Sequence, residues 1–305
     1  MLEWLEITPE LTLVATATRA YLHVPRQLGA DPFREPMRGG GSAETTHWLL
    51  EAAIAAAGRA FVGPSRTPAT DSAHPPGSHE LVSPANWGYR LTGYYHTTHA
   101  TRRLLPIIAQ RFAALGKEQL ALWAQRKITE EAGHDELALR DLSELGYRAR
   151  GLVRAFVPPR AAAWVSLFER LASADDPTSC VGYAHALERL ALLRGPAEVA
   201  AIERGLPAGV NATRCLRVHS ALGGDAQHVR TNVTTTAALD ADARRAIVNA
   251  CYLTARIYFD PSLDDDFRAA GLEAKVLAFR EQTRPLPNLS SNQTTRTHGN
   301  SNPIR

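Results

Sequence analysis

Two short segments of the chain pair a carboxylate with an imidazole at the same spacing. Glu131 lies three residues before His134, and Asp225 lies three residues before His228. On an α-helix this spacing places both side chains on one face, about one turn apart. Carboxylates and imidazoles together suit iron or manganese. Two such pairs that face each other across a helical bundle therefore predict a metal site.

The first pair falls on the apolar side of its predicted helix. At about 100° per residue, Glu131 and His134 lie within the arc of the apolar residues between 128 and 145, whereas Glu136 points away. Burying a carboxylate beside an imidazole is costly unless a cation compensates. Gly133 inside a helix costs about 1 kcal/mol relative to alanine, which indicates close approach of another backbone or a ligand. The alternative is a solvated helix face, on which the Glu–His contact contributes a few tenths of a kcal/mol.

Residues outside the two pairs extend this set. Glu188 lies between the pairs in a strongly helical stretch, and His185 just before it is a ligand, a donor to a ligand or a core histidine. His219 precedes Asp225 by six residues, which is about 240° around an ideal helix, so a straight helix directs it elsewhere. A kink or bulge at Gly223–Gly224 would bring it back. Without that distortion, His219 is an ordinary helical histidine.

Composition narrows the class of protein. The chain has 305 residues, with 45% apolar and 21% charged residues, as in soluble globular proteins. Its net charge of +3 is small and evenly spread, which does not favour a nucleic-acid partner. No run of eighteen apolar residues predicts a membrane span, and the acidic start is unlike a signal peptide. The three scattered cysteines indicate reduced thiols in a cytoplasmic protein.

Helix-forming residues and apolar periodicity predict an all-α fold. We expect helices near 9–24, 45–61, 88–115, 117–146, 159–174, 177–195, 206–222, 224–235, 239–258 and 264–281. The segment 62–87 is rich in Pro, Ser and Thr and predicts a long loop. The expected organisation is an N-terminal helical arm with an irregular loop over 1–87, a helical bundle over 88–281 and a disordered tail over 282–305.

Three motifs carry a family resemblance. In chain order they are Tyr94-Tyr-His96-Thr-Thr-His99, Glu130-Glu131-x-Gly-His134-Asp and Leu139-x-Asp141-Leu-x-x-Leu-Gly146. With Glu188 and the later histidine–aspartate cluster, they resemble the haem-oxygenase-like iron-containing redox enzymes, also called haem-oxygenase-like diiron oxidases and oxygenases. The resemblance covers about residues 88–260.

This resemblance implies a haem-oxygenase-like seven-helix bundle, often dimeric, that binds ferrous iron and activates O2. Members of that family oxidise small molecules by N-oxygenation, by desaturation, or by C–C cleavage of amino acids and fatty acids. By position, the implied metal ligands are Glu131, His134, Glu188, His219, Asp225 and His228. Neighbouring residues that would orient the imidazoles are Glu130, Asp135 and Tyr183.

Three departures from the family pattern bear on the number of metal ions. The family usually has His four residues before the Asp, where this chain has Ala221. The early core helix usually supplies a Glu, but here it offers only His96, Thr97 and His99. Lys127 stands where some members have another ligand, and its ammonium would repel a metal. The site therefore holds one iron, binds a second weakly, or is degenerate.

Two other functions remain open from the sequence. A metal-free, thiaminase-like hydrolase on a related bundle would need an activated cysteine nucleophile. The other alternative is a non-enzymatic bundle that binds a metabolite. A ferritin-like bundle is the rival fold, because it uses similar ligand pairs. The sequence does not specify the substrate.

Overall fold

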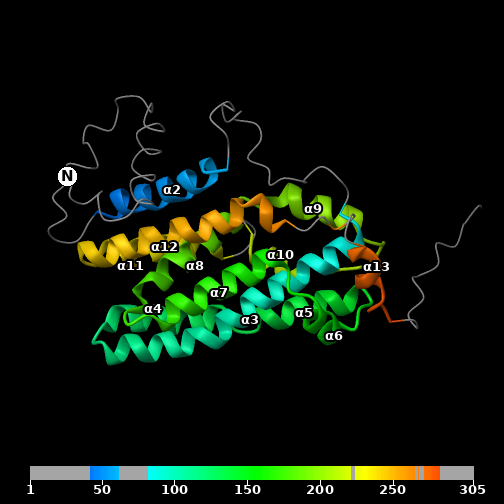
Figure 1. The fold of residues 1–305 in the computed structure, drawn as a ribbon, viewed down its shortest axis with the longest axis horizontal. Helices are drawn as coiled ribbons and strands as arrows, with labels where there is room; N and C mark the ends of the chain where they lie inside the picture. Colours follow the sequence, from blue (N-terminus) through cyan, green and yellow to red (C-terminus); the bar gives the residue numbers. More distant parts are fainter. Residues whose placement is uncertain (1–41, 62–81, 221–223, 265–266, 268–270, 282–305) are drawn as a thin grey trace, which may run out of the picture.

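A computed structural model describes residues 42–61, 82–220, 224–264, 267 and 271–281 (Figure 1). Within these ranges the chain forms helices and no β-strand, which confirms the expected all-α fold. The helix expected over 9–24 and the disordered tail expected over 282–305 lie outside the described residues. None of the described helices combines the length and apolar character that a bilayer span requires.

The α-helices follow one another along the whole described chain. Their bounds are α2 (Ala43–Arg59), α3 (Pro84–Ala114), α4 (Glu118–Glu130), α5 (His134–Glu144), α6 (Ala149–Ala155), α7 (Pro159–Ser173), α8 (Cys180–Ala191), α9 (Pro196–Gly205), α10 (Arg214–Val218), α11 (Asp225–Ala237), α12 (Ala241–Phe259) and α13 (Leu272–Leu277). Short 3-10 helices at Pro177–Ser179 and Pro261–Leu263 precede α8 and follow α12.

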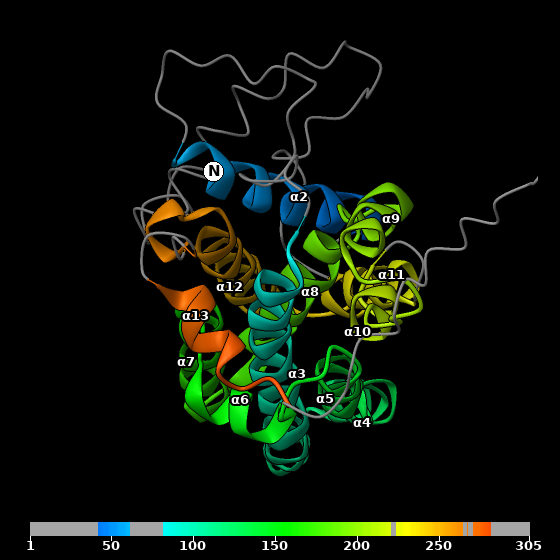
Figure 2. The same cartoon turned by 90° about the vertical axis from the view of Figure 1, so that its right-hand side faces the viewer.

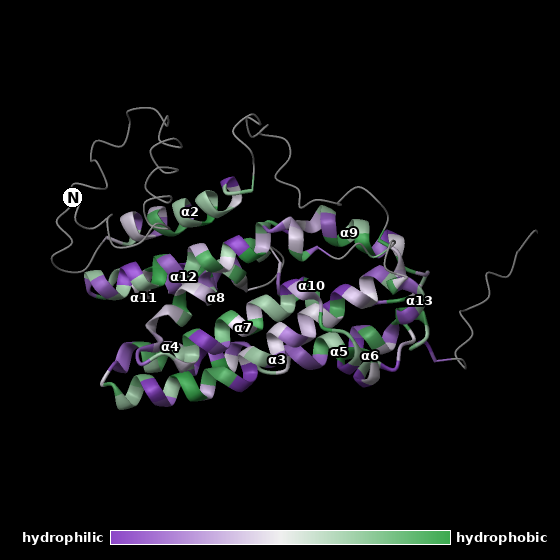
Figure 3. Ribbon diagram, in the orientation of Figure 1, coloured by the Kyte–Doolittle hydropathy of each residue, from purple (hydrophilic) through white to green (hydrophobic). Residues whose placement is uncertain are grey.

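The long helix α3 organises the bundle. It packs against α4, α5 and α7, and the end-on view shows the other helices arranged around it (Figure 2). A second set of helix contacts is centred on α12, which packs against α2 and α8, and α8 also packs against α11. Apolar and polar residues alternate along each helix, as expected where one face lies in a core (Figure 3). Buried residues of α3 belong to both apolar clusters of the molecule, so this helix joins them.

Local sequence explains where α3 begins. The hydroxyl of Ser83 accepts a hydrogen bond from the backbone N–H of Asn86, and Pro84 occupies the first helical position. Trp87 is fully buried one turn later, and its indole N–H donates to the carbonyl of Ala212 at 2.6 Å. The cap and the buried anchor together start the helix four residues before the expected 88.

The helix expected over 117–146 is interrupted. Its two parts, α4 and α5, are joined by a turn at 131–133 in which Gly133 has φ of 81°. A β-carbon on Gly133 would meet no atom within 4 Å, so the expected close approach of another backbone is wrong. The glycine is favoured because its left-handed backbone conformation strains other residues.

The prediction of one helix over 206–222 is also wrong, because the helix observed there is much shorter. Residues 206–213 are not helical, and α10 covers only Arg214–Val218. Pro207 and Gly209, which has φ of 81°, form a turn closed by the N–H of Val210 and the carbonyl of Pro207. Two helices that the periodicity did not predict, α6 and α9, lie in the segments 149–155 and 196–205.

Candidate metal centre

Five of the six residues expected to bind metal lie close together, three of them at helix ends. Glu131 follows the last residue of α4, His134 begins α5, and His219 follows the last residue of α10. Two groups of side chains converge, each with its ligand atoms within 4.8 Å of one another. The first group is Glu131, His134 and His219, and the second is Glu131, Glu188 and His228. Asp225 begins α11, but its side chain lies outside the described part of the chain.

The first group has two imidazoles and one carboxylate. Glu131 is 9% exposed, and its Oε2 lies 3.0 Å from Nδ1 of His134. The rings of His134 and His219 stand at 87° to each other, with centroids 4.6 Å apart. Two histidines and one carboxylate form the ligand set of many mononuclear iron(II) oxygenases, which leaves open positions on the metal. One divalent ion therefore fits the chemistry of this group.

Electrostatics keep Glu131 ionised. Burial by itself raises the pKa of this carboxyl, but the hydrogen bond from His134, the charge that His219 and His134 carry when protonated, and the charge of Lys127 lower the pKa to about 2. The group therefore supplies a negative charge at neutral pH, which favours a cation beside it.

A cation of the protein itself, the ammonium of Lys127, already lies beside the second group. Lys127 is 3% exposed, and its Nζ lies 2.7 Å from Oε1 of Glu188 and 2.8 Å from Oε2 of Glu130. Burial lowers the pKa of Lys127, but the two carboxylates outweigh it and raise the pKa above its ordinary value. The ammonium thus occupies the space beside Glu188 that a second ion would need. A second metal does not fit this group.

Hydrogen bonds fix Glu188 in this arrangement. The amide nitrogen of Asn232 donates to Oε2 of Glu188 at 2.6 Å, and the indole N–H of Trp123 donates to Oδ1 of Asn232 at 2.8 Å. Burial raises the pKa of Glu188 to about 7. The amide hydrogen and the ammonium both favour the ionised carboxylate, so we describe Lys127 and Glu188 as an ion pair.

Residues expected to orient the imidazoles have different contacts. Oε2 of Glu130 lies 3.4 Å from Nε2 of His228, so this carboxylate does approach an imidazole of the cluster. Asp135 instead contacts Nδ1 of His99 at 2.9 Å and Nη1 of Arg102 at 3.1 Å. Tyr183 stacks on the ring of Phe168, with centroids 4.3 Å apart.

The other histidines named by the sequence lie outside both groups. His185 is fully buried, and burial lowers its pKa to about 3, as expected for a neutral core histidine. Nε2 of His96 lies 2.9 Å from the carbonyl of Val153 and 3.0 Å from that of Phe156. His96 therefore joins α3 to the region of α6.

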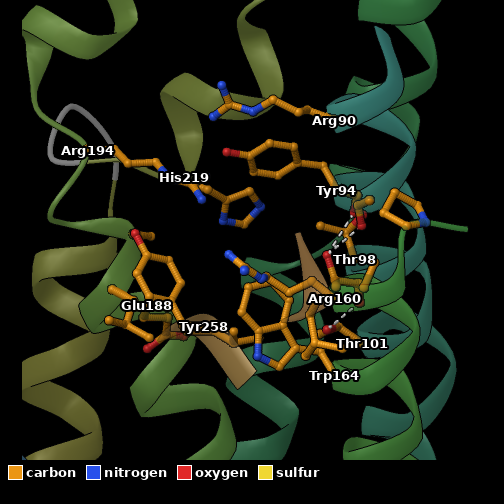
Figure 4. Close-up of a pocket in the computed structure, with 18 of the residues that line it drawn as sticks. Arg90, Tyr94, Thr98, Thr101, Arg160, Trp164, Glu188, Arg194, His219 and Tyr258 are labelled. Atoms are coloured by element: carbon orange, nitrogen blue, oxygen red, sulfur yellow. Dashed lines mark hydrogen bonds between the residues drawn. The ribbon is translucent and has the colours of Figure 1, made fainter. Parts of the chain in front are cut away.

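A cavity of about 840 Å³ borders the candidate metal centre (Figure 4). Glu131, Glu188 and His219 line one part of it, and aromatic rings from α7, α8 and α12 line another. These rings belong to Trp164, Phe168, Tyr183 and Tyr258. Helical periodicity places such residues in a core, and sequence reasoning missed their role as cavity walls. The volume is sufficient for a small organic molecule.

Comparison of the chain with protein-family models, curated proteins and solved structures found no match. A functional assignment therefore depends on the chemistry of the residues themselves.

Proposed function

We propose that this protein is a non-haem iron oxidase or oxygenase that uses O2 to oxidise a small metabolite. One iron ion would be held by Glu131, His134 and His219. The observation that carries the proposal is a group of one buried carboxylate and two partly buried imidazoles beside a cavity large enough for a substrate. When bound, ferrous iron would supply the electrons that activate O2.

The chain's own residues would set the conditions around that ion. Glu131 provides one negative charge, and the two histidines provide neutral nitrogen ligands. Lys127 lies between Glu130 and Glu188 and offsets one of their two negative charges, so the space beside them would be less favourable for a second ion. Aromatic side chains along the cavity would exclude water from the substrate.

The order of these residues also supports a place among the haem-oxygenase-like iron enzymes, which we propose on the motifs alone. In that interpretation the chain has kept the residues of one metal position and filled the other with Lys127. A cytoplasmic location and a small-molecule partner remain part of the same proposal.

The thiaminase-like alternative has less support. Its nucleophile would be a cysteine with a lowered pKa. Cys180, Cys215 and Cys251 are all buried, and burial raises the pKa of each thiol. A protonated thiol inside a core is a poor nucleophile.

Iron loading tests the proposal directly. The protein would be purified without O2, loaded with Fe(II), desalted, and assayed for iron per chain. We expect about one iron per chain in the wild type, and near-complete loss in the double variant His134→Ala, His219→Ala, because one carboxylate cannot hold the ion. The matched control is His47→Ala, an exposed histidine of α2. Failure of the wild type to bind iron, or retention of iron by the double variant, would contradict the proposal.

A further inference from the structure

One end of the cavity is rich in cationic side chains. Arg90 and Tyr94 lie one turn apart on α3, and Arg194 lies just after α8. All three line the same cavity as His219. Figure 4 shows both guanidinium groups and the phenol directed toward the part of the cavity next to His219.

Most cations of the cavity have an internal carboxylate partner. Lys127 pairs with Glu188, and Arg160 lies 2.6 Å from Oδ1 of Asp264. Nη2 of Arg90 lies 3.6 Å from Oε1 of Glu198.

Arg194 differs from the other cations, because the described residues offer it no carboxylate within 4 Å. Its guanidinium carbon instead lies 5.3 Å from the centre of the Tyr94 ring.

Hydrogen-bond donors at this end are also unused. Nε of Arg194 and the hydroxyl of Tyr94 are buried and have no hydrogen-bond partner among the described residues. By contrast, the hydroxyls of Thr97 and Thr98 donate to backbone carbonyls of the preceding turn. A buried donor without an acceptor is costly, so these two indicate a ligand that accepts hydrogen bonds.

The charge balance indicates a single negative charge on that ligand. Arg90 and Arg194 carry two positive charges and Glu198 carries one negative charge, which leaves +1. Burial lowers the pKa of Arg90, and repulsion from the guanidinium of Arg194 lowers it further, to about 10. One carboxylate would relieve this repulsion, whereas a phosphate dianion would exceed it.

We propose that Arg194, Arg90 and Tyr94 form a subsite for one carboxylate of the substrate. Guanidinium groups bind carboxylates through paired N–H donors, and a phenol adds a further donor. The body of the acid would extend along Trp164 and Tyr258. The proposal rests on the proposed function only in identifying the bound acid as the substrate of the iron centre.

Binding to the metal-free protein tests this subsite without depending on iron. Calorimetry would compare 3-phenylpropanoate with its uncharged amide and with 2-phenylethyl phosphate; octanoate provides a second carboxylate. We expect the carboxylates to bind and the amide to bind at least about tenfold more weakly, because it lacks the charge. Equal binding of the amide, tighter binding of the phosphate, or failure of both carboxylates at millimolar concentration would overturn the proposal.

Variants identify the residues that hold the carboxylate. Arg194→Gln should weaken 3-phenylpropanoate binding about tenfold or more, and Tyr94→Phe should weaken it by a smaller factor. Arg204→Gln, at an exposed position of α9, removes the same charge elsewhere and should leave affinity unchanged. Unchanged affinity in Arg194→Gln would overturn the assignment. Iron per chain should be unaltered in Arg194→Gln, so failure of the iron centre and failure of this subsite are distinguishable.

Discussion

Lys127 is buried, and an unpaired ammonium in a buried position would destabilise the fold by several kcal/mol. Lys127 is tolerated because Glu130 and Glu188 lie within 2.8 Å of it. The same contacts decide how many ions the centre accepts, because a lysine and a divalent cation would compete for one carboxylate. On the proposed function, this single side chain would determine how many iron ions the centre binds.

Replacing this lysine should change the stoichiometry. In Lys127→Met, Glu188 and Glu130 lose their positive partner, and we expect iron loading to rise from about one toward two ions per chain. The measurement is iron per chain after anaerobic loading, with circular dichroism to confirm folding. Lys275→Met, an exposed lysine of α13, is the control and should stay at one. A folded Lys127→Met protein that still binds one ion would refute this role.

Sequence spacing anticipated only part of the centre. It drew attention to Glu131, His134 and His228 because a repeated carboxylate–imidazole pair is visible in the chain. It could not show that Lys127 pairs with Glu188, because that contact joins α4 to α8 and depends on how the two helices face each other. His219 was similarly ambiguous, since its direction depends on the end of α10.

At the scale of elements, the turn between α4 and α5 positions two candidate ligands. A continuous helix would place Glu131 and His134 one turn apart on a single face. The turn instead ends one helix at Glu130 and starts the next at His134, with Gly133 in the left-handed region. The approach of the two side chains thus depends on one glycine conformation.

Gly133→Ala should therefore affect both stability and metal binding. We expect a loss of about 1 kcal/mol in the free energy of unfolding, because alanine is strained at this φ, together with weaker iron affinity. Gly209→Ala is matched: it has the same φ of 81° and open space, but lies away from the centre. It should lose similar stability and keep its iron affinity. Denaturant unfolding and iron titration would check both, and equal iron affinities would contradict the role of the turn.

The 3-10 helix before α8 offers a test of pH dependence. Asp176 caps it by accepting from the N–H of Thr178 at 3.1 Å, and its other oxygen contacts the ammonium of Lys117. Burial raises the pKa of Asp176 and is the largest single influence on it, but the hydrogen bonds from Lys117 and Thr178 and the charge of Lys117 together outweigh it and lower the pKa below 3.8.

Because the folded pKa is lowered, this stabilisation is present above pH 3.8 and is lost as pH falls further. Asp176→Asn keeps a capping oxygen and removes the charge. We expect it to be less stable than the wild type at pH 6, with the difference shrinking below pH 3.8. Asp176→Ala, which also loses the cap, should cost about 1 kcal/mol more. Denaturant unfolding at several pH values is the measurement; a difference that does not depend on pH would exclude the charge as its cause.

At the scale of the molecule, close packing of α8 on α12 fixes where Glu188 lies. A β-carbon at Gly182 would lie 2.0 Å from the carbonyl oxygen of Ile247, so only glycine permits this approach. The helical periodicity predicted both helices, because apolar faces are visible in one sequence. Their separation was not predictable, because it depends on which residues of the two helices meet.

Substitution at this contact should destabilise the whole fold. We expect Gly182→Ala to lower the free energy of unfolding by about 3 kcal/mol or more, because backbone atoms must move. Gly58→Ala is the control in α2, where a β-carbon would meet only ordinary contacts with Phe259, at 3.5 Å or more. It should be neutral or slightly stabilising. Thermal unfolding of both variants is the measurement, and a Gly182→Ala protein of unchanged stability would show that the two helices are less closely packed.

The buried cysteines have a consequence if the protein uses O2 as proposed. Thiolates are the sulfur groups most easily oxidised, and burial keeps all three thiols protonated. In the proposed iron centre, stray oxidants would meet the aromatic rings of the cavity, such as Trp164, and hydroxylated tryptophan would be the chemical trace of misdirected turnover.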